Sequence, residues 1–115
     1  MSRPVVVTLS NFSPSTPSLV APLRVAIGLA SAYRRQTVTV MLCDEGVLHA
    51  LKERNPGWVD RYLTSAKAHK VELWADQPSL DLLGLQAEQL HGSVQVKDAD
   101  EFWEVRSGSS LNLSF

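Results

Sequence analysis

One short segment, Cys43-Asp44-Glu45-Gly46, combines the residue types that could do chemistry: a thiol, two carboxylates and a glycine. A thiol becomes a nucleophile when a nearby helix N-terminus lowers its pKa. Asp44 and Glu45 oppose this effect, because neighbouring carboxylates disfavour a second negative charge. The alternative is that Cys43 is a small core residue at the end of a strand, since free cysteines are among the most buried residues. The segment therefore predicts a reactive Cys43 or a structural one.

The two carboxylates have a structural explanation as well as a catalytic one. An acid–base pair needs its members to face each other, whereas adjacent residues usually point apart. We therefore expect Asp44 to cap a helix, with Glu45 in its first turn. Gly46 would then allow a tight turn or a close approach of the backbone.

The loop predicted over residues 10–17 is rich in serine and threonine, and could hold a phosphate as flavodoxins hold FMN. Pro14 and Pro17 remove backbone donors from it, and no Walker-type glycine–lysine pair follows. Nucleotide or flavin binding is therefore a further alternative, and we predict no cofactor. His49, His69 and His91 lie far apart without the spacing of metal ligands, so we predict no metal site.

The composition is that of an ordinary globular domain. The 115 residues suit a single domain over 1–115, with 44% hydrophobic and 20% charged residues. A formal net charge of -1 with scattered basic residues argues against a nucleic-acid groove, and no apolar run is long enough to span a membrane. The single cysteine excludes an internal disulfide and fits a reducing compartment, so we expect a cytoplasmic protein.

Strands and helices alternate along the chain, and the strands lack polar alternation. Such patterns predict an α/β fold with a mainly parallel five-stranded sheet covered by helices on both faces. We expect strands over residues 5–9, 37–42, 71–75, 94–96 and 110–115. We expect helices over residues 18–33, 46–54, 58–70, 78–90 (interrupted at Gly84) and 99–105. The tryptophans, Trp58, Trp74 and Trp103, are interpreted as packing or subunit-contact residues.

Ligands of open parallel sheets bind where loops leave the carboxyl ends of the strands. This rule selects the loops that begin at Ser10, Cys43 and Asp76. The candidate ligand-binding residues are Ser10, Asn11, Asp44, Glu45, Gly46 and Asp76, with Cys43 as the candidate catalytic residue.

The segment Met41-Leu42-Cys43-Asp44-Glu45-Gly46-Val47 resembles the strand and acidic-Gly-Val signature of the DsrE/DsrF-like (TusBCD, YchN-like) superfamily. Three further features resemble the DsrF/TusC branch in particular. They are the overall length, the segment Leu73-Trp74-Ala75 followed by Ser79-Leu80 and Gly84-Leu85, and the tail from Leu111 to Phe115. The resemblance implies a flavodoxin-like three-layer sandwich that assembles into trimers or hexamers, with itself or with related subunits.

Some members of this superfamily carry persulfide sulfur in a relay. The resemblance places their carrier cysteine in the stretch that corresponds to Ala75–Ser79 here, which contains no cysteine. The protein is therefore predicted to be a non-carrying or accessory component of sulfur relay. The alternative is a sulfurtransferase that carries persulfide on Cys43, and whether the protein is an enzyme stays open.

Overall fold

The computed structural model describes residues 5–12, 19–32, 37–53 and 57–115. Five strands form one sheet in the order β4-β3-β2-β1-β5, and all four strand pairs are parallel. The strands are β1 (Val5–Leu9), β2 (Val38–Leu42), β3 (Val71–Asp76), β4 (Val94–Lys97) and β5 (Leu111–Ser114). This confirms the predicted α/β fold and parallel sheet.

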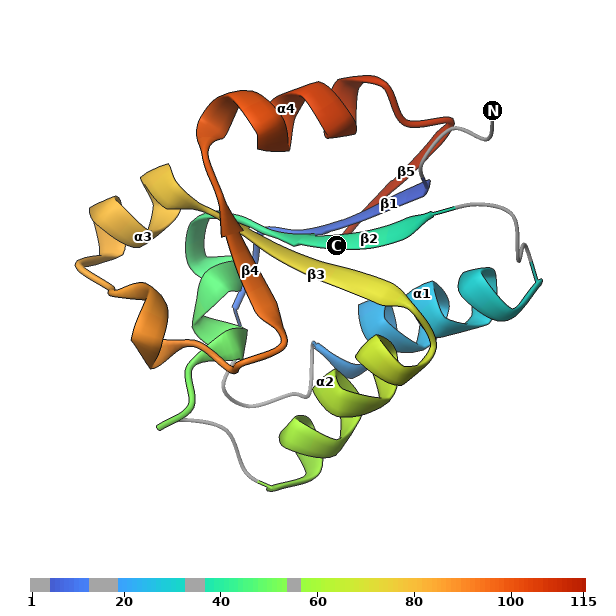
Figure 1. The fold of residues 1–115 in the computed structure, drawn as a ribbon, viewed down its shortest axis with the longest axis horizontal. Coiled ribbons are helices and arrows are strands. Elements are labelled where there is room, and N and C mark those ends of the chain that lie inside the picture. Colours follow the sequence, from blue (N-terminus) through green and yellow to red (C-terminus); the bar gives the residue numbers. More distant parts are fainter. Residues whose placement is uncertain (1–4, 13–18, 33–36, 54–56) are drawn as a thin grey trace.

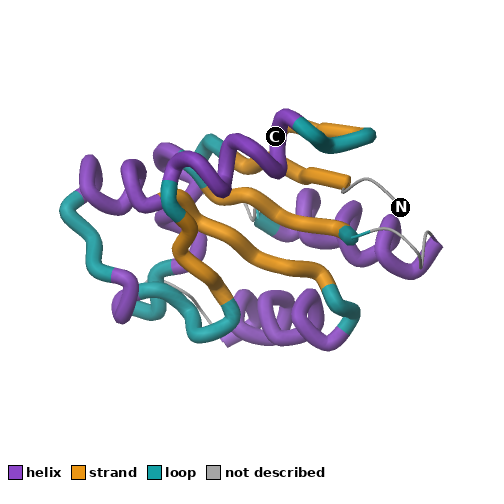
Figure 2. Tube along the Cα trace, turned by 45° about the horizontal axis from the view of Figure 1, so that its top comes forward, coloured by secondary structure: helices purple, strands orange, loops and turns teal. Residues whose placement is uncertain are grey.

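Helices cover both faces of the sheet (Figures 1 and 2). The helices α1 (Val20–Ala32) and α2 (Gly57–Ala68) pack on one face, and among the described residues α4 (Ala99–Ser107) is the helix that covers the other. The short elements η1 (Asp44–Ala50), α3 (Gln77–Leu83) and η2 (Ala87–Gln89) lie beyond the carboxyl ends of the strands or beside them. The three layers are those predicted for a flavodoxin-like sandwich.

The two faces of the sheet differ in their cores. The three central strands are buried throughout, apart from the half-buried Glu72, which explains their continuous apolar sequences. The large core lies between the sheet and α1, η1, α2 and α3. Under α4 the core is small and consists of Val6, Met41, Cys43, Trp74 and Phe102.

Several predicted elements differ in detail from the observed ones. The segment after β2 forms a 3-10 helix, η1, which ends at Ala50, where an α-helix to residue 54 was expected. Leu51 leaves the helix because it forms an antiparallel bridge with Leu90, a contact that only the tertiary structure supplies. The interruption at Gly84 is confirmed, because this residue ends α3 in the left-handed conformation (φ 69°).

Some predictions fall outside the described residues. These are most of the serine-rich loop, namely residues 13–17, together with the end of the helix expected over residues 46–54 and the side chain of Trp58. Of the other tryptophans, Trp74 is buried and Trp103 is 48% exposed on α4. Within the described part of the chain, no helix has the length and apolar character needed to cross a membrane.

Candidate functional site

The carboxyl ends of β1, β2 and β3 meet at one edge of the sheet. The register aligns Leu9 with Leu42 and Leu42 with Ala75, so Ser10, Cys43 and Asp76 follow at neighbouring positions. Side chains alternate along a strand, so Cys43 and Asp76 return to the α4 face. The structure therefore brings together candidate residues that are far apart in the sequence.

Cys43 lies under α4 and is 8% exposed. The pKa of its thiol is raised from 9.0 to about 11, chiefly by burial and then by the charges of Asp44 and Asp76, while Arg106 opposes the shift. At neutral pH only about one thiol in ten thousand would be ionised. The reactive interpretation of Cys43 is thus disfavoured by its surroundings, and the interpretation as a buried strand-end residue fits them.

The turn after β2 requires glycine at position 46. The Cys43 amide donates a hydrogen bond to the Leu9 carbonyl (3.1 Å), and the Gly46 amide donates one to the Cys43 carbonyl (2.9 Å). The first bond holds the turn against β1 and the second closes the turn. A Cβ on Gly46 would collide there with the backbone carbonyl of Leu9. Gly46 is therefore a packing requirement of this edge, as the close approach predicted for it implied.

The helix cap predicted for Asp44 is wrong. Cys43 occupies the N-cap position of η1 and makes no side-chain cap, while Asp44 is the first residue of the helix. Asp44 adopts a positive φ of 51°, which few residues other than glycine accept. Its backbone amide donates a hydrogen bond to Oγ of the buried Ser79 at 2.8 Å, and this bond ties η1 to α3.

Asp76 is a buried carboxylate with an unused oxygen. It is 6% exposed, and its Oδ1 is buried without a hydrogen-bond partner. It stands at the N-cap of α3 yet makes no cap hydrogen bond, and because α3 begins at Gln77 the loop expected over Asp76–Ser79 is absent. Lys97 lies opposite Asp76 in the β3–β4 register, but its ammonium lies over the Trp74 ring, 4.9 Å from the centroid.

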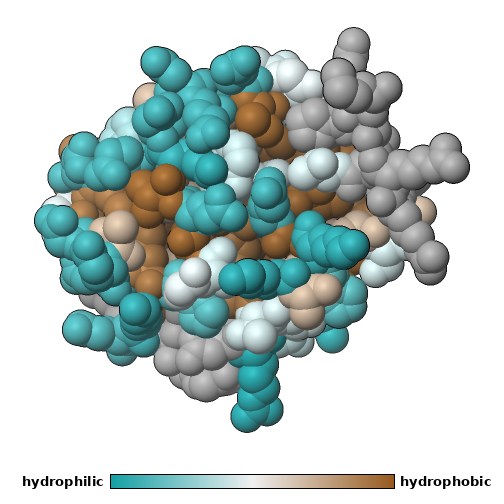
Figure 3. Space-filling view, viewed as in Figure 1, coloured by the Kyte–Doolittle hydropathy of each residue, from teal (hydrophilic) through white to brown (hydrophobic). Residues whose placement is uncertain are grey.

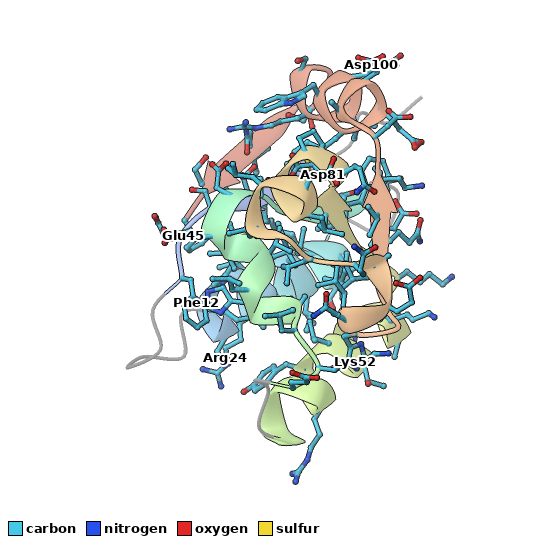
Figure 4. The ribbon with its side chains drawn as sticks, turned by 90° about the vertical axis from the view of Figure 1, so that its left-hand side faces the viewer. Phe12, Arg24, Glu45, Lys52, Asp81 and Asp100 are labelled. Atoms are coloured by element: carbon cyan, nitrogen blue, oxygen red, sulfur yellow. The ribbon has the colours of Figure 1, made fainter. Side chains whose placement is uncertain are left out.

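The remaining candidates surround this edge. Ser10 is half-buried, and its amide donates to the Phe115 carbonyl at 3.3 Å. Asn11 is exposed, and its carbonyl accepts a hydrogen bond from Nε2 of His49 at 2.9 Å. Glu45 is exposed on η1, and Figure 4 looks onto the edge from the side where it lies.

His49 anchors the first loop and is not placed as a base for Cys43. Its ring packs against that of Phe12, with centroids 4.7 Å apart, and Figure 4 shows Phe12 below Glu45. Burial lowers the pKa of His49, and its hydrogen bond to Asn11 opposes that shift. The buried histidine therefore links the loop after β1 to η1.

Charge limits the chemistry of this edge. Asp44, Glu45 and Asp76 are acidic, and the described residues contain no group of three or more His, Cys, Asp or Glu side chains that could hold a metal ion. The exposed Asp44 and Glu45 repel phosphates, whereas the cationic groups of Lys97 and Arg106 lie over the rings of Trp74 and Trp103. The arrangement therefore disfavours the nucleotide or flavin alternative. The unpartnered Oδ1 of Asp76 is buried and therefore does not face solvent.

A separate groove lies at the amino ends of β3 and β4. It is lined by Lys67, Lys70, Val71, Glu72, Leu73, Gly92, Ser93 and Gln95. None of the residues predicted from the sequence contributes to it. The groove and the carboxyl edge therefore do not form one site.

Sequence reasoning missed four residues near Cys43. Trp74 has a buried Nε1 without a partner, Ser79 fixes the turn, and Lys97 and Arg106 bring positive charge. Lys97 could have been found by aligning the expected strands, because it follows the fourth strand at the same edge. Arg106 could not have been found from the sequence, because it reaches this edge only through the packing of α4.

The fold has known counterparts. Neither a protein-family model nor a curated protein matches this sequence. Among solved structures, the YchN protein of E. coli superposes with a TM-score of 0.80 and 22% identity, over 100% of both chains. The chain has the YchN fold. A protein of unknown function from Methanobacterium thermoautotrophicum is similar at a TM-score of 0.78 and 15% identity, over 99% of this chain and 100% of that one.

The likeness to YchN confirms the fold implied by the resemblance to the DsrE/DsrF-like superfamily. It extends over the full length of the chain, as the sequence resemblance did over most of it. At these identities it does not distinguish between branches, so the DsrF/TusC assignment stays a prediction.

Proposed function

We propose that this protein is a cytoplasmic DsrE/DsrF-like component of sulfur relay that does not itself carry the sulfur. The observation that carries this proposal is the state of its only cysteine. Cys43 is buried under α4, and burial with two nearby carboxylates raises the pKa of its thiol to about 11. A carrier must attack a donor persulfide as a thiolate, and this thiol stays protonated at neutral pH.

The position expected for a carrier supports the same conclusion. The segment Ala75–Ser79 runs from the end of β3 into the first turn of α3, and it contains Asp76 and no cysteine. A buried carboxylate at this point opposes a second anion, so a persulfide on the neighbouring Cys43 would be destabilised. The site therefore fits an accessory subunit better than a carrier.

Sulfur loading tests the proposal directly. The protein is incubated with a cysteine desulfurase and cysteine, and its intact mass is measured. In a genuine transfer the Cys43 thiolate would attack the outer sulfur of the enzyme persulfide, release the enzyme thiolate, and gain one sulfur atom of about 32 Da. We expect no adduct on the native protein.

Two variants make that result interpretable. Gln77→Cys in a Cys43→Ser background places an exposed thiol at the first residue of α3, within the expected carrier stretch. We expect this variant to gain the adduct, which shows that the desulfurase can load this edge. A native adduct that disappears in Cys43→Ser would overturn the proposal and establish the Cys43 sulfurtransferase instead.

The resemblance also leads us to propose an assembly, either a homo-oligomer (trimer or hexamer) or a hetero-oligomer with related subunits. A non-carrying component needs a partner that brings the sulfur, and the exposed carboxylates of Asp44 and Glu45 at this edge could contact that partner. Light scattering on the purified protein measures the assembly, and a stable monomer would contradict the homo-oligomer.

A further inference from the structure

The β5 strand forms an open edge of the sheet and has neither a charged residue nor a proline to protect it. It pairs with β1 on one side, and in the described part of the chain no strand pairs with the other. Residues 107–115 contain no charged residue and no proline. Natural edge strands are commonly protected by such residues, because an open row of backbone groups can pair with another chain.

The opposite edge of the sheet differs in this respect. β4 contains Lys97, whose ammonium lies 3.6 Å from a Glu101 carboxylate oxygen. The β4 edge faces the reader in Figure 3, where hydrophilic side chains lie among hydrophobic ones. β5 lies behind β1 in Figure 1. The unprotected edge is thus specific to β5.

The hydrogen bonds to β1 identify the backbone groups of β5 that remain open. The Phe115 amide donates to the Thr8 carbonyl at 2.8 Å, and the Phe115 carbonyl accepts from Ser10 at 3.3 Å. Alternate residues of a strand direct their backbone groups to opposite sides. The amides and carbonyls of Asn112 and Ser114 therefore point to the open side.

The side chains of β5 form a pattern that is complementary to itself. Leu111, Leu113 and Phe115 lie on one face of the sheet, and Leu111 and Phe115 are 42% and 38% exposed. In an antiparallel pair centred on Leu113, the Leu111 of one copy faces the Phe115 of the other. Asn112 then faces Ser114, so the open backbone groups of both strands meet.

We propose that a second copy of this chain pairs with β5 in this antiparallel register. Asn112 of one copy exchanges both backbone hydrogen bonds with Ser114 of the other, and the two Leu113 side chains meet at the twofold axis. An uncharged strand is suited to its own copy, because no like charges face each other across the axis.

This contact goes beyond the proposed function and is independent of sulfur loading. A twofold pair requires an even number of subunits, which is compatible with a hexamer and not with a trimer. A trimer in solution would overturn the β5 pairing and leave the proposed sulfur-relay role intact. A persulfide on the native protein would overturn the proposed non-carrying role and leave the β5 pairing intact. The two proposals therefore fail separately.

Disulfide trapping tests the register. Residues at the centre of a non-hydrogen-bonded antiparallel pair have Cα atoms about 4.5 Å apart, within the range that a disulfide bridges. In a Cys43→Ser background, we expect Leu113→Cys to form a cross-linked dimer on mild oxidation. Asn112→Cys is the matched control, because its partner across the axis is Ser114, and we expect at least tenfold less cross-linking.

Ser114→Pro tests the contact without a new thiol. Proline removes the outward amide of Ser114 and leaves the amides directed to β1 intact, a position that an edge strand tolerates. We expect light scattering to show an even-numbered native assembly that loses half its mass in this variant, with Ser114→Ala unchanged. Equal cross-linking of Leu113→Cys and Asn112→Cys, or a native monomer or trimer, would overturn the proposal.

Discussion

The buried thiol of Cys43 makes the stability of the fold depend on pH in the alkaline range. Its pKa is 9.0 when unperturbed and about 11 in the folded protein. A pKa raised by folding adds stability that is complete below the lower value and is lost as the pH rises towards the upper one. A shift of two pKa units corresponds to about 2 to 3 kcal/mol of unfolding free energy lost between pH 8 and pH 11 or above.

Urea denaturation at pH 8 and pH 11, followed by far-ultraviolet circular dichroism, measures this loss. Other groups titrate over the same interval, so the quantity of interest is the difference between the native protein and Cys43→Ala, which has no thiol. We expect the native protein to lose about 2 kcal/mol more than the variant. Equal losses would mean that the thiol is not held in its protonated form, and the argument against a Cys43 carrier would fail with it.

Two further predictions concern the edge around Cys43. Gly46→Ala should reduce the unfolding free energy by about 3 kcal/mol or more, because the new methyl group collides with the Leu9 carbonyl. The control is Gly28→Ala in α1, where the new methyl group enters open space. This control should be neutral or stabilising in the same denaturation experiment. Because burial lowers the pKa of His49 below 6.5, unfolding should become easier as the pH falls through that value. His49→Gln, which can still donate to the Asn11 carbonyl, should lose this pH dependence, and a native protein equally stable at pH 7.5 and pH 5 would contradict the assignment.

The order of the elements was predictable because each signal is local. The unbroken β-branched runs of β1, β2 and β3 indicated strands buried on both faces, and the structure buries them. The start of α4 is equally local, since the Asp98 carboxylate accepts a hydrogen bond from the Glu101 amide at 2.8 Å.

The failures concern residues whose conformation depends on distant partners. The Asp44 cap was wrong because its amide is held by Ser79, 35 residues away in the sequence, and its backbone takes a left-handed conformation. The helix after β2 is shorter than predicted because Leu51 pairs with Leu90. Neither partner can be found from the spacing of residues near residue 44.

The α/β class, the parallel sheet and the edge shared by Cys43, Asp76 and Ser10 were predictable, because they follow from local patterns and from the common direction of parallel strands. The tertiary structure gives that edge its chemical character. It placed α4 over Cys43 and Asp76 beside it, and burial and charge together hold the thiol in its protonated form. It also left β5 at the open side of the sheet, where an uncharged strand can pair with a second copy.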